Sequence, residues 1–151
     1  MKKQSRRIYI LLAMIAATLL FIWLQSTMSQ TASAKESGFF LKLLLRFFPK
    51  KIRENTALAH QIIRKMAHMT EFAFLGAELT ILLRRRLVVY PLAAGLFAAL
   101  IDETVQIFTG RGASVTDVWI DFAGVVIGSA VALGVMAIVR AVRRRRARKK
   151  E

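Results

Sequence analysis

The stretch Arg64–Glu78, RKMAHMTEFAFLGAE, brings together residue types that can exchange protons or bind ions. Helical spacing of three, four and seven residues puts four of them on one face of an α-helix: Arg64, His68, Glu71 and Glu78. A histidine can gain or lose a proton near neutral pH, and a carboxylate one turn away can assist it. His68 and Glu71 are therefore candidates for acid–base chemistry, although both could equally form hydrogen bonds between helices.

A second helical stripe begins with small residues and ends with polar ones: Gly95, Ala99, Asp102 and Gln106. Asp102 is followed directly by a second carboxylate, Glu103. Neighbouring residues of a helix point about 100° apart. We therefore expect Asp102, and not Glu103, to face the centre of the protein.

A third stripe follows the junction TGRGAS, and it comprises Asp117, Asp121, Gly124 and Gly128. The two glycines form a GxxxG motif, which allows two membrane helices to approach closely. The polar ends of all three stripes are predicted to lie at the same depth, so that they converge in one place.

This convergence predicts a ligand-binding site. Its candidate residues are Arg64, Lys65, His68, Glu71, Asp102, Glu103, Gln106, Arg111, Asp117 and Asp121. If the site performs a reaction, the candidate catalytic residues are His68, Glu71 and Asp102. Placing an ionisable group in hydrocarbon costs about 2.5–3.5 kcal/mol, which favours a functional role. The alternative is structural, because basic side chains could pair with the carboxylates and lock the helices together.

Metal-ligand spacing of a recognisable kind is lacking, so the sequence predicts neither a metal nor a cofactor. A site with hard oxygen ligands from His68, Glu71, Asp117 and Asp121 remains the alternative. The chain has no cysteine, which excludes disulfides and thiol chemistry.

The elements that position these residues are predicted to be transmembrane helices. The chain has 151 residues, of which 56% are hydrophobic. Its apolar runs lie at about residues 8–24, 67–83, 87–101 and 118–139. A spanning helix needs about 20 mostly apolar residues, and the runs approach this length. We predict an all-α integral membrane protein with four transmembrane helices, forming a single domain over residues 1–151, with its core at 8–139 and a basic tail at 140–151.

Basic residues set the predicted orientation. They cluster within residues 2–7, 84–86 and 140–150, and four spans place all three clusters on one side of the membrane. The positive-inside rule makes that side cytoplasmic, with both termini inside. The first apolar run and the ASAK sequence after it could instead form a cleavable signal peptide, which would leave the other helices unchanged.

The first outer loop contains the stretch GFFLKLLLRFFPKKIR, residues 38–53. It is too short to span, and we predict an interfacial helix on the outer leaflet. A hairpin that dips into the membrane is the alternative. We expect the next helix to start near Ile62, with His60 in the preceding loop.

Two motifs in the chain, IRKMAHMTEFAFLG and DETVQIFTGRGASVTDVWIDFAGVVIG, resemble the signature of the VanZ-like family. The resemblance covers about residues 8–139 and is strongest over 64–128. The sequence LQSTMSQ at 24–30 matches the family's serine-rich turn only loosely, so we assign no role to Ser26 or Ser29. The resemblance implies a multi-pass protein of the bacterial cytoplasmic membrane. The named member of the family is associated with resistance to teicoplanin, a lipidated glycopeptide that acts on outer-leaflet cell-wall precursors.

Two classes of function fit these observations. The first is a non-enzymatic protein whose outer-leaflet pocket binds a lipid-linked cell-wall headgroup or a lipoglycopeptide. The alternative is a membrane-embedded enzyme that modifies such a lipid by acid–base chemistry. We favour binding, because no nucleophile with an oriented base is visible in the sequence. The expected partners are therefore membrane lipids and such a headgroup, and no nucleic acid, because the basic tail lies against a membrane.

Overall fold

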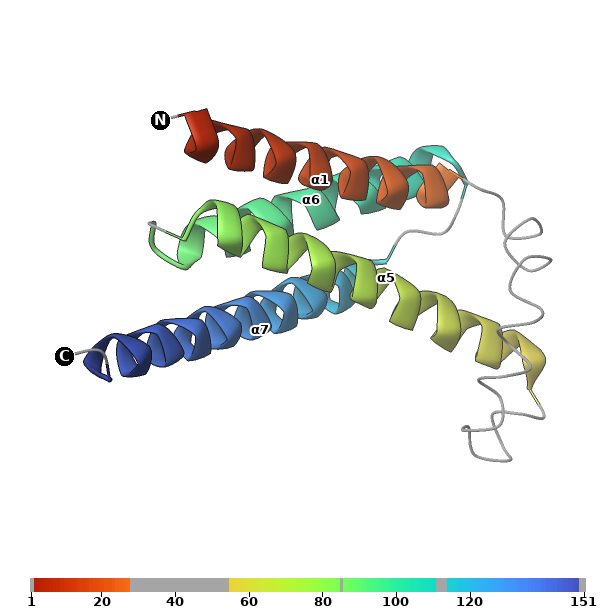
Figure 1. Ribbon diagram of the computed structural model, residues 1–151. Coiled ribbons are helices and arrows are strands. Elements are labelled where there is room, and N and C mark those ends of the chain that lie inside the picture. Colours follow the sequence, from red (N-terminus) through yellow and green to blue (C-terminus); the bar gives the residue numbers. More distant parts are fainter. Residues whose placement is uncertain (1, 28–54, 85, 111–113, 150–151) are drawn as a thin grey trace.

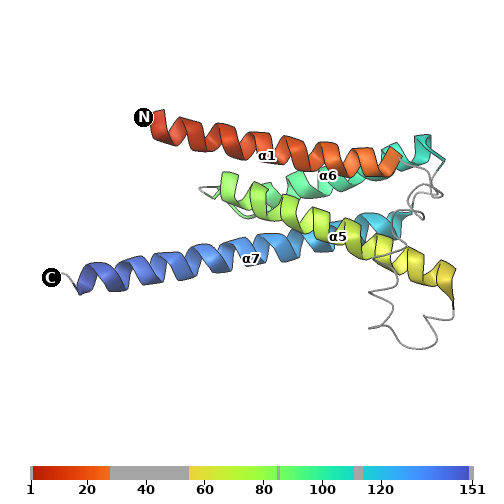
Figure 2. The ribbon, with the colours of Figure 1, turned by 45° about the vertical axis from the view of Figure 1, so that its right-hand side comes forward.

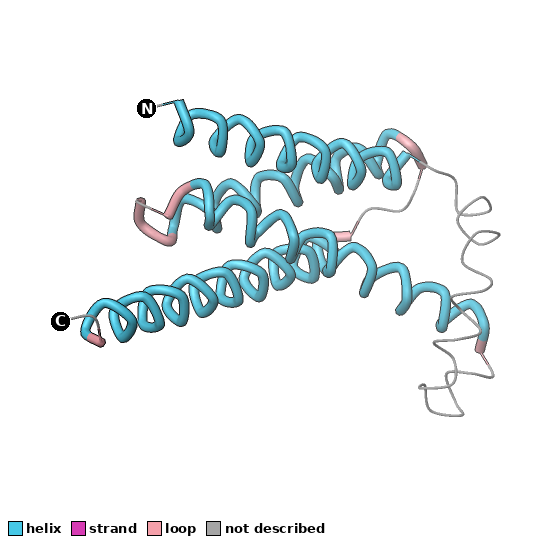
Figure 3. Tube along the Cα trace, viewed as in Figure 1, coloured by secondary structure: helices cyan, strands magenta, loops and turns pink. Residues whose placement is uncertain are grey.

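The computed structural model describes residues 2–27, 55–84, 86–110 and 114–149. Within these ranges the chain is helical and contains no strand (Figures 1 and 3). The helices are α1 (Lys2–Thr27), α5 (Thr56–Leu82), α6 (Val89–Phe108) and α7 (Val115–Arg148). The predicted all-α class is therefore confirmed for the described part of the chain.

Three of these helices are long and apolar enough to cross a membrane. The qualifying segments are Ser5–Thr27, Val89–Phe108 and Val115–Arg148. They expose large apolar side chains such as Phe97 and Val131, as helices surrounded by lipid do. Helix α5 has the length, but it carries ionisable residues along its whole course and is not among the three. The protein is a membrane protein, and a fourth span through α5 remains a prediction.

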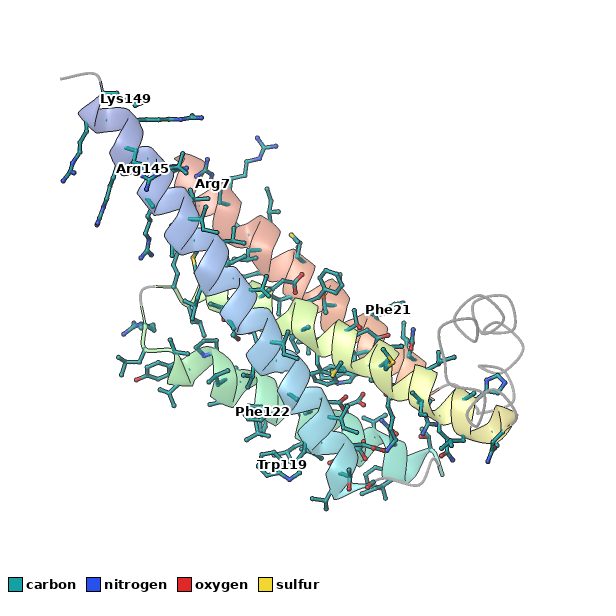
Figure 4. The ribbon with its side chains drawn as sticks, turned by 90° about the horizontal axis from the view of Figure 1, so that it is seen from below. Arg7, Phe21, Trp119, Phe122, Arg145 and Lys149 are labelled. Carbon is teal, nitrogen blue, oxygen red and sulfur yellow. The ribbon has the colours of Figure 1, made fainter. Side chains whose placement is uncertain are left out.

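Both chain ends and the turn between α5 and α6 lie at the same end of the helix bundle (Figures 1 and 2). The three basic clusters therefore gather at that end, as Arg7 and Arg145 illustrate (Figure 4). The opposite end holds the C-terminal turns of α1 and α6 and the first turns of α7. Charge and polarity thus divide the bundle into a basic end and a second polar end.

Helices α5 and α7 form the most extensive contact of the bundle, and glycines make it possible. A Cβ atom placed on Gly124 would overlap the carbonyl oxygen of Met69, and one on Gly128 would overlap that of Ala73. Gly76 of α5 approaches the backbone of Val125 in the same way. The predicted close approach through the GxxxG motif is confirmed, and it brings the polar stripes of α5 and α7 together.

Helix α5 starts earlier than the sequence predicted. It begins at Thr56, where the side chain of Asn55 accepts a hydrogen bond from the backbone N–H of Leu58 at 3.1 Å. Such a cap satisfies a free N–H of the first turn, so the helix can begin there. The placement of His60 in a loop was wrong, because it lies within α5 and is half-buried. The predicted interfacial helix at 38–53 lies outside the described residues.

Candidate functional site

Asp102 is the most deeply buried ionisable residue of the predicted site, with an exposed fraction of 0%. Its Oδ1 atom accepts a hydrogen bond of 2.6 Å from the hydroxyl of Ser26, at the end of α1. Its Oδ2 atom accepts one of 2.8 Å from the amide of Gln106, one turn further along α6. Asp102 thus joins α1 to α6, and both of its oxygens are held in place.

Glu103 is also buried, with an exposed fraction of 5%, which corrects the expectation that only Asp102 faces inward. Its Oε2 atom accepts a hydrogen bond of 3.0 Å from the backbone N–H of Ser114, the N-cap residue of α7. Helix α6 packs against both α1 and α7. Two faces of α6 are therefore covered at this end, so that neighbouring carboxylates can both be enclosed.

His68 of α5 and Asp121 of α7 are buried beside Asp102, with exposed fractions of 7% and 3%. One potential ligand atom from each of these three residues lies within 4.8 Å of the others. Glu71 follows His68 on the same face of α5, and its Oε2 atom is 3.8 Å from Nδ1 of the imidazole. The predicted convergence of three polar stripes is therefore present in the structure.

Lys65 and Asp117 form an ion pair between α5 and the first turn of α7. Their side chains are 36% and 17% exposed, so the pair lies at the edge of the cluster rather than inside it. This is one of the structural pairings that the sequence left open. Arg64, the preceding residue, is half-buried and lines the same region, whereas Arg111 lies outside the described residues.

A narrow cavity of about 10 Å³ lies among these side chains. Its lining residues are Arg64, Lys65, His68, Glu103, Gln106, Asp117, Ile120 and Asp121. This volume holds a single water molecule or ion, and it is too small for a sugar or peptide headgroup. A larger cavity of about 820 Å³ lies at the basic end between α1 and α5, but it contains none of the predicted site residues.

The helices that carry these residues lie within a stretch of the chain that matches a known protein family. The model of the VanZ/LLP1 family matches residues 8–139, which include all of α5 and α6 and most of α1 and α7. The chain belongs to the VanZ/LLP1 family. No curated protein and no solved structure matches the chain.

The VanZ/LLP1 match extends over Ser26, a residue to which the sequence assigned no role. In the structure the Ser26 side chain is fully buried against Asp102. The serine-rich stretch after the first apolar run was the available signal. Helical periodicity could not interpret it, because the partner of Ser26 is 76 residues away in the chain.

The carboxyl groups of this VanZ/LLP1 protein are not all paired. Glu103 Oε1 is buried and receives no hydrogen bond from any residue in the described ranges. A buried acceptor without a donor costs about 1–3 kcal/mol, and more when it is charged. The ion pairs in the described residues therefore do not account for the whole cluster, which supports a role beyond holding the helices together.

Proposed function

We propose that this VanZ/LLP1 protein crosses the bacterial cytoplasmic membrane four times and contributes to resistance against teicoplanin-type glycopeptides. Both termini would then be cytoplasmic, and the polar cluster around Asp102 would face the outer leaflet. There the protein would bind the anionic headgroup of a lipid-linked cell-wall precursor or of a lipoglycopeptide. The observation that carries this proposal is the convergence of buried polar side chains from three apolar helices and α5, at the end opposite the basic clusters.

The position of the cluster supports an outward-facing site. Basic residues favour the cytoplasmic side, and all three basic clusters lie at the other end of the bundle. The exposed aromatic ring of Trp119 lies near the start of α7, on the outer surface of the bundle (Figure 4). Tryptophan is enriched where a membrane meets water, which is consistent with an interface at this depth.

The chemistry of the site supports recognition of an anion at its mouth. Arg64 and Lys65 line the edge of the cavity, and Lys65 is 36% exposed at its side chain. Basic side chains bind phosphate and carboxylate through charge-assisted hydrogen bonds. The cavity of about 10 Å³ cannot admit the headgroup itself. The headgroup would therefore rest against these two residues, above the buried carboxylates.

The hydrogen bonds favour binding over catalysis. Ser26 has the buried hydroxyl of the cluster, and it donates to the carboxylate of Asp102, which also accepts from Gln106. An activated serine needs a base that can remove its proton, and such a base is most often a histidine held by a third group. The network around Ser26 is instead that of a fixed structural connection.

The test compares cells that express the wild-type chain with cells that express variants, at matched protein levels. We expect the wild type to raise the teicoplanin concentration that cells survive, and Arg64→Gln or His68→Ala to remove most of this effect. Arg140→Gln, an exposed residue of the basic tail, is the matched control and should behave as wild type. Equal sensitivity with and without the wild-type chain would refute the resistance proposal.

A second measurement separates binding from catalysis. Purified protein is mixed with teicoplanin or with a polyprenyl diphosphate, and binding and product formation are followed by calorimetry and mass spectrometry. Saturable binding without a change in mass is expected. A new product that disappears in Asp102→Asn would instead identify an enzyme.

A further inference from the structure

The centre of the cluster has the composition of a metal site. His68, Asp102 and Asp121 come from α5, α6 and α7, and each offers a ligand atom within 4.8 Å of the other two. All three side chains are buried. One imidazole nitrogen combined with carboxylate oxygens suits divalent ions such as Mn²⁺ and Zn²⁺, whereas thiolate-preferring ions are excluded by this donor set.

An independent observation points to a bound cation. Glu103 Oε1 is buried and receives no hydrogen bond within the described ranges, although the residue lines the same cavity as His68 and Asp121. The other oxygen of Glu103 is already held by the N–H of Ser114. Buried acceptors without a donor are rare in native proteins and call for an explanation. A cation in the cavity would satisfy this oxygen.

The charge balance favours the same conclusion. The carboxyl group of Asp121 lies close enough to four others for their negative charges to repel its own. These four belong to Asp102, Glu103, Asp117 and Glu71. Among the described residues that line the cavity, the basic side chains are Arg64 and Lys65, and Lys65 is already paired with Asp117. Among the described residues of the cluster, the carboxyl groups therefore outnumber the Arg and Lys side chains that line the cavity.

The surroundings of Asp102 resemble those of a metal ligand. Its two oxygens accept hydrogen bonds from Ser26 and Gln106. Ligating carboxylates are commonly oriented by such partners, and each carboxylate oxygen keeps a further lone pair for a metal ion. The short bond from Ser26 therefore fixes the orientation of Asp102 without preventing coordination.

We propose that His68, Asp102 and Asp121 bind one divalent transition-metal ion, with Glu103 next to it in the cavity. The cavity of about 10 Å³, which is lined by His68, Glu103 and Asp121, is large enough for one ion, and Asp102 lies within ligand distance of His68 and Asp121. The ion would be held by protein side chains alone, so this inference does not depend on the headgroup proposed above. A bound ion would also add positive charge below the mouth of the site, where an anionic headgroup would lie.

The test uses full-length protein in detergent, freed of its purification tag and treated with a chelator. Zn²⁺ and Mn²⁺ are each titrated by calorimetry, and the melting temperature is measured with and without the ion. We expect one ion to bind per chain and to raise the melting temperature. His68→Gln, Asp102→Asn and Asp121→Asn should each weaken binding by at least about tenfold. Ser26→Ala should weaken it by about tenfold through the orientation of Asp102.

Glu78→Gln is the matched control, because Glu78 lies on the same helix as His68 but outside the cavity, and its Oε1 atom accepts a hydrogen bond from Thr18 of α1. It should bind the ion as wild type does. Without metal, Asp121→Asn should melt no lower than wild type, because it removes one of several clustered negative charges. The proposal would be overturned if neither ion bound with one ion per chain. It would also be overturned if the ligand substitutions left ion binding unchanged. A metal-free Asp121→Asn protein that melts far below wild type would overturn it too.

Discussion

Ser26 Oγ of α1 donates a hydrogen bond of 2.6 Å to Asp102 Oδ1 of α6, and both side chains are fully buried. Helix α1 makes a further contact at this end, where the hydroxyl of Thr109 donates to the backbone carbonyl of Ser26 at 3.3 Å. The first apolar helix is therefore built into the polar cluster. A chain cleaved after this helix would lose the partner that holds Asp102.

The first prediction concerns this bond. Ser26→Ala should lower the free energy of unfolding by about 1–3 kcal/mol, because it leaves one oxygen of a buried carboxylate without its donor. The matched control is Thr27→Ala. Thr27 is exposed and donates to the carbonyl of Leu24 in its own helix, so its loss should change stability little. Melting temperatures of the two variants in detergent check the difference, and equal melting would contradict it.

The second prediction concerns the contact between α5 and α7. Gly128→Ala should destabilise the protein by at least about 1–3 kcal/mol, because its Cβ would overlap the carbonyl of Ala73 and force the helices apart. Gly134→Ala is the control in the same helix, since its added Cβ would meet no atom within 4 Å from the described residues beyond its own helix backbone and chain neighbours. It should be neutral or stabilising by up to about 1 kcal/mol, as alanine is the better helix former. We expect a lower melting temperature for Gly128→Ala and an unchanged or higher one for Gly134→Ala.

Much of the site was predictable because helices repeat every 3.6 residues. The stripes through His68, Asp102 and Asp121 follow from sequence spacing, and the structure brings them together. The close packing at Gly124 and Gly128 also followed from a local pattern.

The remaining features depend on which helices are neighbours, and spacing within one helix does not contain that information. Ser26 meets Asp102 only because α1 packs against α6, and Lys65 meets Asp117 only because α5 packs against α7. Glu103 is buried for the same reason, since its face of α6 is covered by the start of α7. The early start of α5 depends on the Asn55 cap, a side-chain hydrogen bond that helical periodicity does not contain.

The third prediction concerns orientation in the membrane. The chain has no cysteine, so single cysteines can be introduced cleanly. Val115→Cys, which is exposed at the start of α7, should react with a membrane-impermeant thiol reagent on intact cells. Arg86→Cys, at the basic end, should react only after the membrane is opened. Labelling of Arg86→Cys on intact cells would show that the basic end faces outward. It would therefore refute an outward-facing polar cluster.

The fourth prediction concerns the partner of Asp117. Lys65→Ala should lower the free energy of unfolding by about 1–3 kcal/mol, because the half-buried Asp117 loses its partner. This value lies between those typical of exposed and of buried ion pairs. Exchanging the two charges, as Lys65→Asp with Asp117→Lys, should restore part of the loss.

A related prediction concerns Arg111. Arg111→Ala should keep a near-normal melting temperature, since Lys65 already neutralises Asp117. It should nevertheless reduce teicoplanin resistance if Arg111 binds an anionic ligand. Gly110 before it has a positive φ of 70°, a conformation that favours glycine. Melting temperature and resistance are measured side by side for all variants. A melting temperature that collapses in Arg111→Ala but not in Lys65→Ala would show that Arg111, and not Lys65, is the structural partner.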